Sequence, residues 1–488
     1  MRKPKSEFIK RQIKRALKET NLLFGQRSQG KVCDVYDLGF VLVLVATDRQ
    51  SAFDRVLCAI PFKGQALSQL SKWWFEQTAD IVSNHLLAVV GPNALVVKKL
   101  RRIPVEVVVR GYNTGSTDTS VWTAYAQGVR DFCGNKLPDG MVKNQVFGQP
   151  IITPTTKEGK HDEQLPAAEI VASGILTRVQ WDQIASTALQ LFARGQELSL
   201  RGGLILVDTK YEFGYDEEGN LCLIDEIHTP DSSRFWIAKT YQERFSAGQE
   251  PNQVSKEFLR LWYKDHCDPY HDEVLPEAPE DLVIRMSLLY IDCYQRITGQ
   301  QFVSDTGRDL EERIAANLKF FRPENLERLP ETRVRVLLGS WSDLEQVRTP
   351  IRFFKALPQV TIQTDVRSCH RNPWEVVGLA EVFGDFDGVV CAGSKAFQLP
   401  GVLKAFLVAE DQASIPVFAV ALRGRTEKAT LAARLSIEEV PGQPLEMAGP
   451  DEAFFGPLGM FAALRSLVER RFTERTISYK SMEENIEV

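Results

Sequence analysis

The sequence lacks long hydrophobic runs, paired cysteines and an excess of positive charge. Its longest apolar stretch, Phe40–Ala46, is far shorter than the roughly 20 residues that span a bilayer. The eight cysteines are dispersed and none stands in a C-x-x-C pair, which excludes a clustered zinc or disulfide framework. The formal net charge of -5 excludes a sequence-independent nucleic-acid coat. We therefore expect a cytoplasmic protein that binds neither membranes nor nucleic acid.

The rest of the composition, 44% apolar and 25% charged among 488 residues, is that of a globular protein. Strand-like runs alternate with turns over residues 28 to about 110. Residues 175–200 have the apolar spacing of a helix, and strand-like runs follow at 204–215 and 221–227. Several helices are expected within 251–322. This pattern predicts an α+β part with antiparallel sheets.

The pattern becomes regular after Arg333. Four apolar strands, each followed by a helical stretch, are expected at 334–340, 360–366, 387–393 and 415–422. Near-continuous apolar runs indicate strands buried on both faces, and therefore a parallel sheet between helices. We expect a C-terminal α/β three-layer domain with a parallel flavodoxin-like sheet.

Gly25–Lys31 reads GQRSQGK and matches the G-x-x-x-x-G-K pattern of a P-loop. The next residue is Val32, where a P-loop needs Ser or Thr for magnesium. A strand rather than a helix is expected to follow, so we reject the P-loop interpretation. A hairpin closing over nucleotide phosphates, with Lys31 supplying charge, is one alternative. A plain structural hairpin is the other.

The run LVDTKYEFG, residues 206–214, is the most informative segment. Alternation along a strand places Asp208, Lys210 and Glu212 on one face. DEEGN is a tight turn, so the next strand pairs back and Glu212 lies roughly opposite Ile224–Asp225. Two converging carboxylates favour magnesium. A solvated outer face is the alternative, and a register shift of one residue would separate the two acids.

Other polar segments favour nucleotide-dependent chemistry on an anionic substrate, because they combine basic groups for phosphates or carboxylates with acids for a metal. They are ATDRQSAFD, RGYNTGS, PTTKEGKHD and DEIHTPDSSR. These segments contain Ser51, Arg110, Ser116, Lys157, His161, Asp162, Asp231 and Arg234.

These motifs resemble, in order, those of SAICAR synthetase from about Leu22 to Gln301; PVEVVVRGYNTGS and LVDTKYEFG are close to family signatures. The resemblance implies ligation of aspartate to the carboxylate of carboxyaminoimidazole ribonucleotide (CAIR) by MgATP in purine biosynthesis, through an acyl phosphate. Cys33 departs from the family, which usually has Arg there.

The resemblance also implies roles for individual residues. Gly30, Lys31, Lys99 and Glu106 would contact ATP, and Glu212 and Asp225 would hold Mg²⁺. Lys210 and Asp231 would be catalytic. The substrate would be bound by Ser51, Arg110, Ser116 and Arg234, and by Lys157, His161 and Asp162 of a mobile loop.

The C-terminal part, about Val334–Leu467, resembles the phosphoribosylaminoimidazole carboxylase family through GSWSD and SCHRNP. The resemblance implies that His370 is a general acid or base. It also implies that Ser340, Asp343, Ser368 and Arg371 bind a ribonucleotide and that the domain forms an octamer. The family's small-residue loop reads AGSKAFQLPG here, and this bulk weighs against activity. Its LPG ending favours the mutase type.

We therefore expect a synthetase domain at 1–301 with lobes of about 1–110 and 111–301, a linker at 302–332, and a carboxylase-like domain at 333–488. The first hypothesis is a bifunctional enzyme, with CAIR formed in the second domain. The second is an active synthetase whose second domain is non-catalytic and serves oligomerisation or ligand sensing. A phosphotransferase is a third possibility, although a kinase H-R-D loop is missing.

Overall fold

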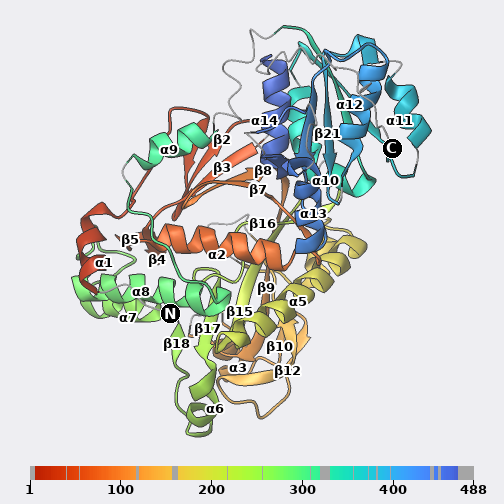
Figure 1. Cartoon of the computed structure of the whole chain (residues 1–488). Coiled ribbons are helices and arrows are strands. Elements are labelled where there is room, and N and C mark those ends of the chain that lie inside the picture. The colour runs from red at the N-terminus through yellow and green to blue at the C-terminus, as the bar shows by residue number, and fades with distance from the viewer. Residues whose placement is uncertain are drawn as a thin grey trace, which may run out of the picture. The chain divides into compact units, whose positions relative to one another are not determined.

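The chain forms two compact units in the computed structural model, Met1–Ile314 and Ala315–Val488 (Figure 1). Residues 6–470 are described except for 40, 54, 117–119, 157–162, 217, 255, 308, 319–329, 356, 372, 381–382, 396, 440–444 and 449–451. No helix of the described residues is long and apolar enough to cross a membrane. The domain boundaries expected from the sequence remain a prediction.

The first sheet of the N-terminal unit has five strands in the order β1-β2-β3-β8-β7. All its pairings are antiparallel, as predicted. Val41, Val43 and Val45 of β3 are buried, which is the period of two expected for a strand with one covered face. The strands are β1 Gln26–Gln29, β2 Cys33–Asp37, β3 Val41–Ala46, β7 Leu86–Gly91 and β8 Ala94–Lys98.

The second sheet has nine strands and is centred on two long antiparallel strands, β9 (Arg101–Asn113) and β15 (Leu204–Tyr215). Their register places Arg110 opposite Asp208 and Glu106 opposite Glu212. The other strands are β6 Ser83–Asn84, β12 Gln145–Ile152, β13 Thr155–Thr156, β14 Glu163–Gln164, β16 Leu221–Ile224, β17 Ser233–Ile237 and β18 Gln253–Val254. Two small hairpins pair β4 Arg49–Ala52 with β5 Arg55–Ala59 and β10 Asp131–Phe132 with β11 Asn135–Lys136.

Helix α5 (Arg178–Arg201) is the predicted helix and packs on β15. It begins with a capping box between Thr177 and Gln180. Gly195 lets it come close: a Cβ there would lie 2.6 Å from Leu206 Cδ2. Helix α2 (Lys63–Gln77) packs against α8 (Glu280–Thr298). The remaining helices are α1 Ser6–Gln12, α3 Val121–Ala126, α4 Ala167–Ala172, α6 Ala238–Ser246, α7 Glu257–His266 and α9 Leu310–Asn317.

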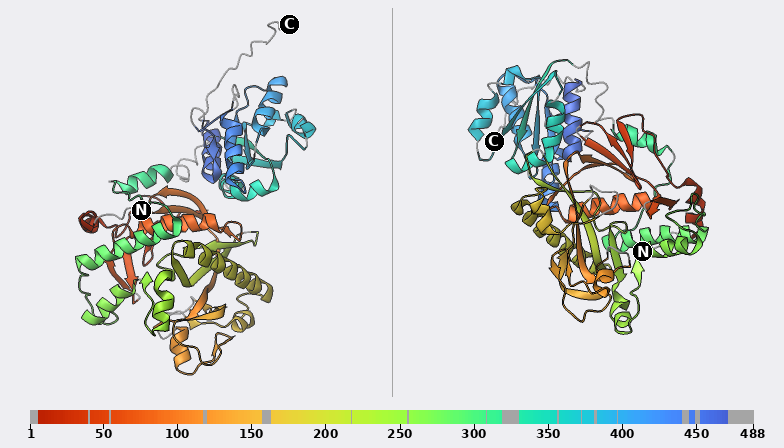
Figure 2. Two further views of the ribbon diagram at one scale, coloured as in Figure 1. Left: turned by 60° about the horizontal axis from the view of Figure 1, so that its bottom comes forward. Right: turned by 180° about the vertical axis from the view of Figure 1, so that it is seen from behind.

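The C-terminal unit contains a parallel sheet in the order β20-β19-β21-β22-β23. Parallel pairing confirms the prediction from the apolar runs, whereas the flavodoxin-like domain type remains a prediction. Helices cover both faces (Figures 1 and 2). The elements are β19 Thr332–Leu338, α10 Trp341–Lys355, β20 Val360–Val366, α11 Pro373–Ala380, β21 Gly388–Gly393, α12 Leu399–Ala409, β22 Val417–Ala421, α13 Glu427–Glu438, β23 Phe454–Phe455 and α14 Gly456–Val468.

Candidate active site

Lys210 on β15 is surrounded by three carboxylates, which we call the Lys210 group. Its Nζ lies 2.6 Å from Glu212 Oε1, 3.2 Å from Glu106 Oε1 and 3.3 Å from Asp225 Oδ2. The hairpin register is the predicted one, with Glu212 paired to Ile224. Asp225 then leaves β16 with a φ of 61°, which Asp adopts more readily than most residues. Glu212 and Asp225 therefore converge on one cation.

Charge controls protonation in this group. Burial by itself lowers the pKa of Lys210, but the charges of Asp225, Glu212 and Glu106 outweigh burial and raise the pKa above its ordinary value. Lys210 therefore keeps its proton at neutral pH. Burial, and then the charge of Asp231, raise the pKa of the adjacent Glu226 to about 8. No motif in the sequence marks Glu226, although it follows Asp225 directly.

Two arginines share one carboxylate further along the same strand face; we call this the Asp208 group. Asp208 accepts hydrogen bonds from Arg234 Nε at 2.9 Å and from Arg234 Nη2. Arg110 Nη1 lies 3.7 Å from Asp208 Oδ2. Gly115 has a φ of 117°, and a Cβ there would lie 3.3 Å from Arg234 Nη1. Two guanidinium groups and one carboxylate leave net positive charge, which suits an anionic ligand.

A third group surrounds Asp231. Lys63 Nζ lies 2.6 Å from Asp231 Oδ2, and Lys256 Nζ lies 3.6 Å from Oδ1. The hydroxyl of Tyr290 donates to Oδ1 at 2.5 Å. Burial by itself raises the pKa of Asp231, but Lys256 and Lys63 outweigh it and hold the pKa well below its ordinary value. Asp231 is therefore an anion in the folded protein.

Sequence reasoning missed Lys63 and Tyr290. They lie on α2 and α8, far from Asp231 in the chain, and no local spacing marks them. The backbone N–H of Lys210 donates to the carbonyl of Ser232 at 3.1 Å. The segment that carries Asp231 is therefore fixed beside the Lys210 group.

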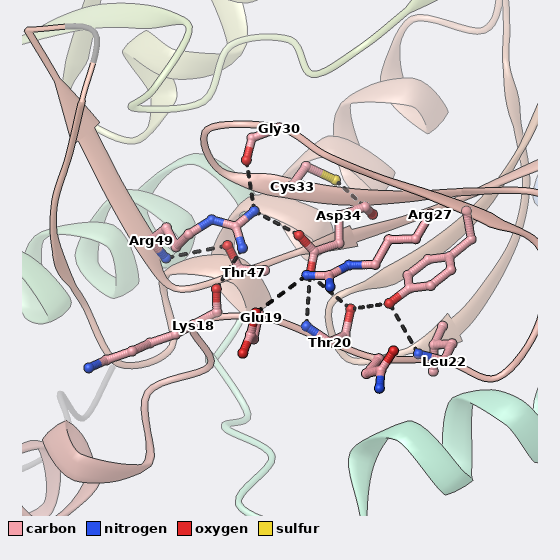
Figure 3. Close-up of polar contacts among 12 residues, drawn as sticks. Lys18, Glu19, Thr20, Leu22, Arg27, Gly30, Cys33, Asp34, Thr47 and Arg49 are labelled. Carbon is pink, nitrogen blue, oxygen red and sulfur yellow. Dashed lines mark hydrogen bonds and ion pairs between the residues drawn. The ribbon is translucent and has the colours of Figure 1, made fainter.

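The segment Gly25–Lys31 contributes to a hairpin whose turn is anchored by Arg49 (Figure 3). Arg49 donates to the carbonyls of Gly30 at 2.9 Å and Lys31 at 3.2 Å, and to Asp34 Oδ1 at 2.8 Å. A strand and not a helix follows the turn, which agrees with the sequence-based rejection of a P-loop. One buried guanidinium therefore binds two carbonyls of the turn, and the hydrogen bond from Gly30 N–H to the Cys33 carbonyl at 2.8 Å closes it.

Cys33 is half-buried beside this turn. Burial, and then the charges of Asp225 and Asp34, raise the pKa of its thiol to about 12. Two arginines supply positive charge close by: Arg49, and Arg27, whose Nη2 lies 3.3 Å from Asp34 Oδ2.

The other residues expected in this site are placed as follows. Lys99 Nζ lies 2.6 Å from Asp37 Oδ2. Ser51 is on β4 beside Gln50, whose Oε1 lies 2.8 Å from the hydroxyl of Tyr290. Ser116 is exposed and follows the glycine that borders the Asp208 group. Three expected residues lie outside the described part of the chain: Lys157, His161 and Asp162.

The Lys210 group fits magnesium that is shared with a phosphate. Among the described residues, no three His, Cys, Asp or Glu side chains are grouped to hold a metal ion alone. Magnesium usually binds through one or two carboxylates plus substrate phosphates. Glu212 and Asp225 both reach one ammonium, so a single cation can contact both.

In the C-terminal unit, the expected residues follow β19 and β20. Ser340 Oγ donates to Asp343 Oδ2 at 2.8 Å. Arg371 Nη2 donates to the carbonyl of the residue before Ser340 at 3.2 Å, and its backbone N–H donates to Ser368 Oγ at 3.4 Å. His370 is exposed. The two loops therefore contact each other.

Comparisons with known proteins concern the N-terminal unit. A family model described as SAICAR synthetase matches residues 26–277. Phosphoribosylaminoimidazole-succinocarboxamide synthase of Legionella pneumophila is 56% identical over 304 residues, which are 62% of this chain and 97% of that protein. The chloroplastic enzyme of Arabidopsis thaliana is 51% identical over 63% of this chain and 77% of that protein. The SAICAR synthase of Saccharomyces cerevisiae, solved with SAICAR, matches 59% of this chain and all of its own, with 31% identity and a TM-score of 0.52.

Proposed function

This chain belongs to the SAICAR synthetase family, and we propose that it ligates aspartate to the carboxylate of CAIR, converting ATP to ADP and phosphate. It is a ligase of purine biosynthesis that uses ATP. The observation that carries the reaction is the shared face of β15, where a positive Asp208 group adjoins an acidic Lys210 group. Asp208 and Lys210 are two residues apart, about 7 Å along a strand.

A carboxylate is a poor electrophile, so the proposed first step transfers the γ-phosphoryl group of ATP to the CAIR carboxylate. The aspartate amine then attacks this acyl phosphate and phosphate leaves. Catalysis of this kind consists mostly of positioning and of stabilising phosphoryl charge. Lys210 stays protonated, and its positive charge stabilises the negative charge of the phosphoryl group during transfer.

The residues at the nucleotide would be the turn Gly30–Lys31, Lys99 and Glu106. Glu212 and Asp225 would hold Mg²⁺, which neutralises phosphate charge when bound. The fixed position of the turn supports this assignment, because Arg49 binds both of its carbonyls.

The CAIR anion would bind the Asp208 group through Arg110 and Arg234, with Ser116 beside it. Asp231, near Ser51, would contact the ribonucleotide and the attacking amine. Lys157, His161 and Asp162 would complete the site from their loop. The net positive charge of the Asp208 group supports anion binding there.

The test is SAICAR formation from CAIR, aspartate and MgATP, followed by absorbance, for the wild type and Lys210→Met. Loss of one preorganised charge at a developing anion costs about 100- to 1,000-fold in rate, and we expect a loss of that size in kcat. Lys239→Met, an exposed lysine on α6, should leave the rate unchanged. ADP formation without aspartate would instead indicate a phosphotransferase.

A second candidate function is CAIR formation by the C-terminal unit, with His370 as general acid or base. The contact between the Ser340 and Arg371 loops at the carboxyl ends of parallel strands supports ligand binding there. His370→Asn should abolish CAIR formation and leave the synthetase unchanged. A non-catalytic unit that serves oligomerisation, an octamer by the family resemblance, is the competing role.

A further inference from the structure

The place where a ligand would enter the C-terminal sheet is defined by strand order. β19 lies between β20 and β21, so the connections from β19 and β21 leave on opposite sides of this pair. Ligands of open parallel sheets bind outside the carboxyl ends of the strands at such a switch point. Here Gly339 follows β19 and Gly393 ends β21, and the N–H of Gly339 donates to the carbonyl of Ala392 at 3.0 Å. We call the space over these two glycines the crevice.

The ring of Phe397 occupies this crevice. A Cβ added to Gly393 would lie 2.3 Å from Phe397 Cδ2, and a Cβ added to Gly339 would lie 3.3 Å from Phe397 Cε2. The ring is 5% exposed and belongs to the core that α11, α12 and α13 share with the sheet. Glycines let the protein backbone come close to a bound ligand. Here the space that they leave is filled by an aromatic ring of the chain itself.

One hydrogen bond and the adjoining start of α12 hold Phe397 in place. Its backbone N–H donates to Ser436 Oγ on α13 at 2.8 Å. Its ring lies one residue before Gln398, the N-cap of α12. Movement of the ring out of the crevice therefore requires a break with α13 or a shift of the start of α12.

A buried acceptor lies next to the ring. Asp343 is 2% exposed, and its Oδ1 has no hydrogen-bond partner among the described residues. Asp343 Oδ2 lies 3.5 Å from the same Gly339 Cβ position that the ring approaches. Oδ2 also accepts a hydrogen bond from Ser340 Oγ at 2.8 Å. Removal of the ring would therefore leave a cavity beside the Asp343 carboxylate, whose other oxygen has no hydrogen-bond partner among the described residues. A planar ring that carries an N–H donor, such as an imidazole, matches both the shape and this acceptor.

We infer that Phe397 is a plug that closes the crevice of the C-terminal unit, so that this unit does not transfer carboxylate while the ring is in place. The inference concerns the second candidate function and is independent of the synthetase reaction.

The first experiment uses the full-length protein with aspartate and MgATP. SAICAR formation is started either from CAIR or from N-carboxyaminoimidazole ribonucleotide. Formation from CAIR, with only the non-enzymatic rate from the second substrate, is the expected result. Enzymatic formation from the second substrate would overturn the plug. No product from CAIR would overturn the proposed synthetase function. The role of Phe397 would then be decided by the binding experiment below, which does not depend on synthetase activity.

The second experiment measures binding of imidazole and of aminoimidazole ribonucleotide by calorimetry to the wild type, Phe397→Ala and Phe397→Leu. At least tenfold tighter binding to Phe397→Ala, reduced again in the double variant with Asp343→Asn, is expected. Equal binding by wild type and both variants would contradict the inference. Phe397→Leu keeps a core side chain if the alanine variant unfolds, and synthetase activity reports folding of the rest of the chain.

The matched control is Phe354→Ala. Phe354 is fully buried on α10 and contacts Phe461 of α14, about 20 Å along the helix from its start beside the crevice. Truncation of Phe354 removes a phenylalanine ring from the same unit without opening the crevice. Tighter binding to Phe354→Ala as well would show general loosening of the unit and contradict the plug.

Discussion

At the residue scale, Asp231 shows how a buried charge depends on its partners. Lys63 is fully buried, whereas the side chain of Lys256 is 26% exposed and 3.6 Å away. Loss of one partner of a buried pair costs about 3–5 kcal/mol, whereas an exposed pair contributes about 0–1 kcal/mol. We predict that Lys63→Met lowers the free energy of unfolding by about 3–5 kcal/mol and that Lys256→Met lowers it by about 1 kcal/mol or less. Denaturant unfolding of both variants checks this, and equal losses would refute it.

At the element scale, the connection between β16 and β17 is tied to the core by His228. The ring Nε2 of His228 lies 2.6 Å from the hydroxyl of Tyr211 on β15, and the ring packs edge-on against Trp74 of α2. Burial lowers the pKa of His228 to about 3, whereas an unfolded histidine titrates near about 6.5. The unfolded state therefore binds more protons between these values. His228 therefore has no effect on the free energy of unfolding above a pH of about 6.5. Below that pH, it lowers the free energy of unfolding by about 1.4 kcal/mol for each pH unit.

We therefore predict that His228→Gln flattens the fall in the free energy of unfolding between about pH 6 and pH 4 by about 1.4 kcal/mol per pH unit. Chemical denaturation over this range measures the slope. His271→Gln, whose side chain is 82% exposed in the folded protein, serves as the control and should keep the wild-type slope. An unchanged slope in His228→Gln would show that the histidine does not titrate on unfolding.

At the scale of the whole molecule, each unit has its own hydrophobic core. A ligand that binds one folded unit stabilises that unit alone, by about 2.7 kcal/mol at 100 times its Kd. We predict that MgADP raises the unfolding transition of the N-terminal unit in calorimetry and leaves that of the C-terminal unit in place. Excess EDTA should reduce the shift, because Glu212 and Asp225 then face the phosphates without a cation. Equal shifts of both transitions would contradict a nucleotide site confined to the N-terminal unit.

Local patterns predicted the main elements well. The helix expected at 175–200 is α5, and the strand expected at 204–215 is β15. The strand expected at 221–227 is β16, which ends at Ile224 because Asp225 adopts a positive φ. A tight turn fixes the hairpin register, so the approach of Glu212 to Asp225 followed from the sequence. The parallel C-terminal sheet followed from its apolar runs. In each case the information lies within a few residues of the chain.

The sequence by itself determined which side chains share the face of β15, because alternation is a property of the extended backbone. It also determined the family, through motifs that stand in order along the chain. Only the tertiary structure decided that Lys63 and Tyr290 meet Asp231, and that the ring of Phe397 fills the space over two glycines. The contacts of Asp231 join segments that are far apart in the sequence, and the position of the Phe397 ring depends on the path of a loop. Local residue spacing encodes neither of these two arrangements.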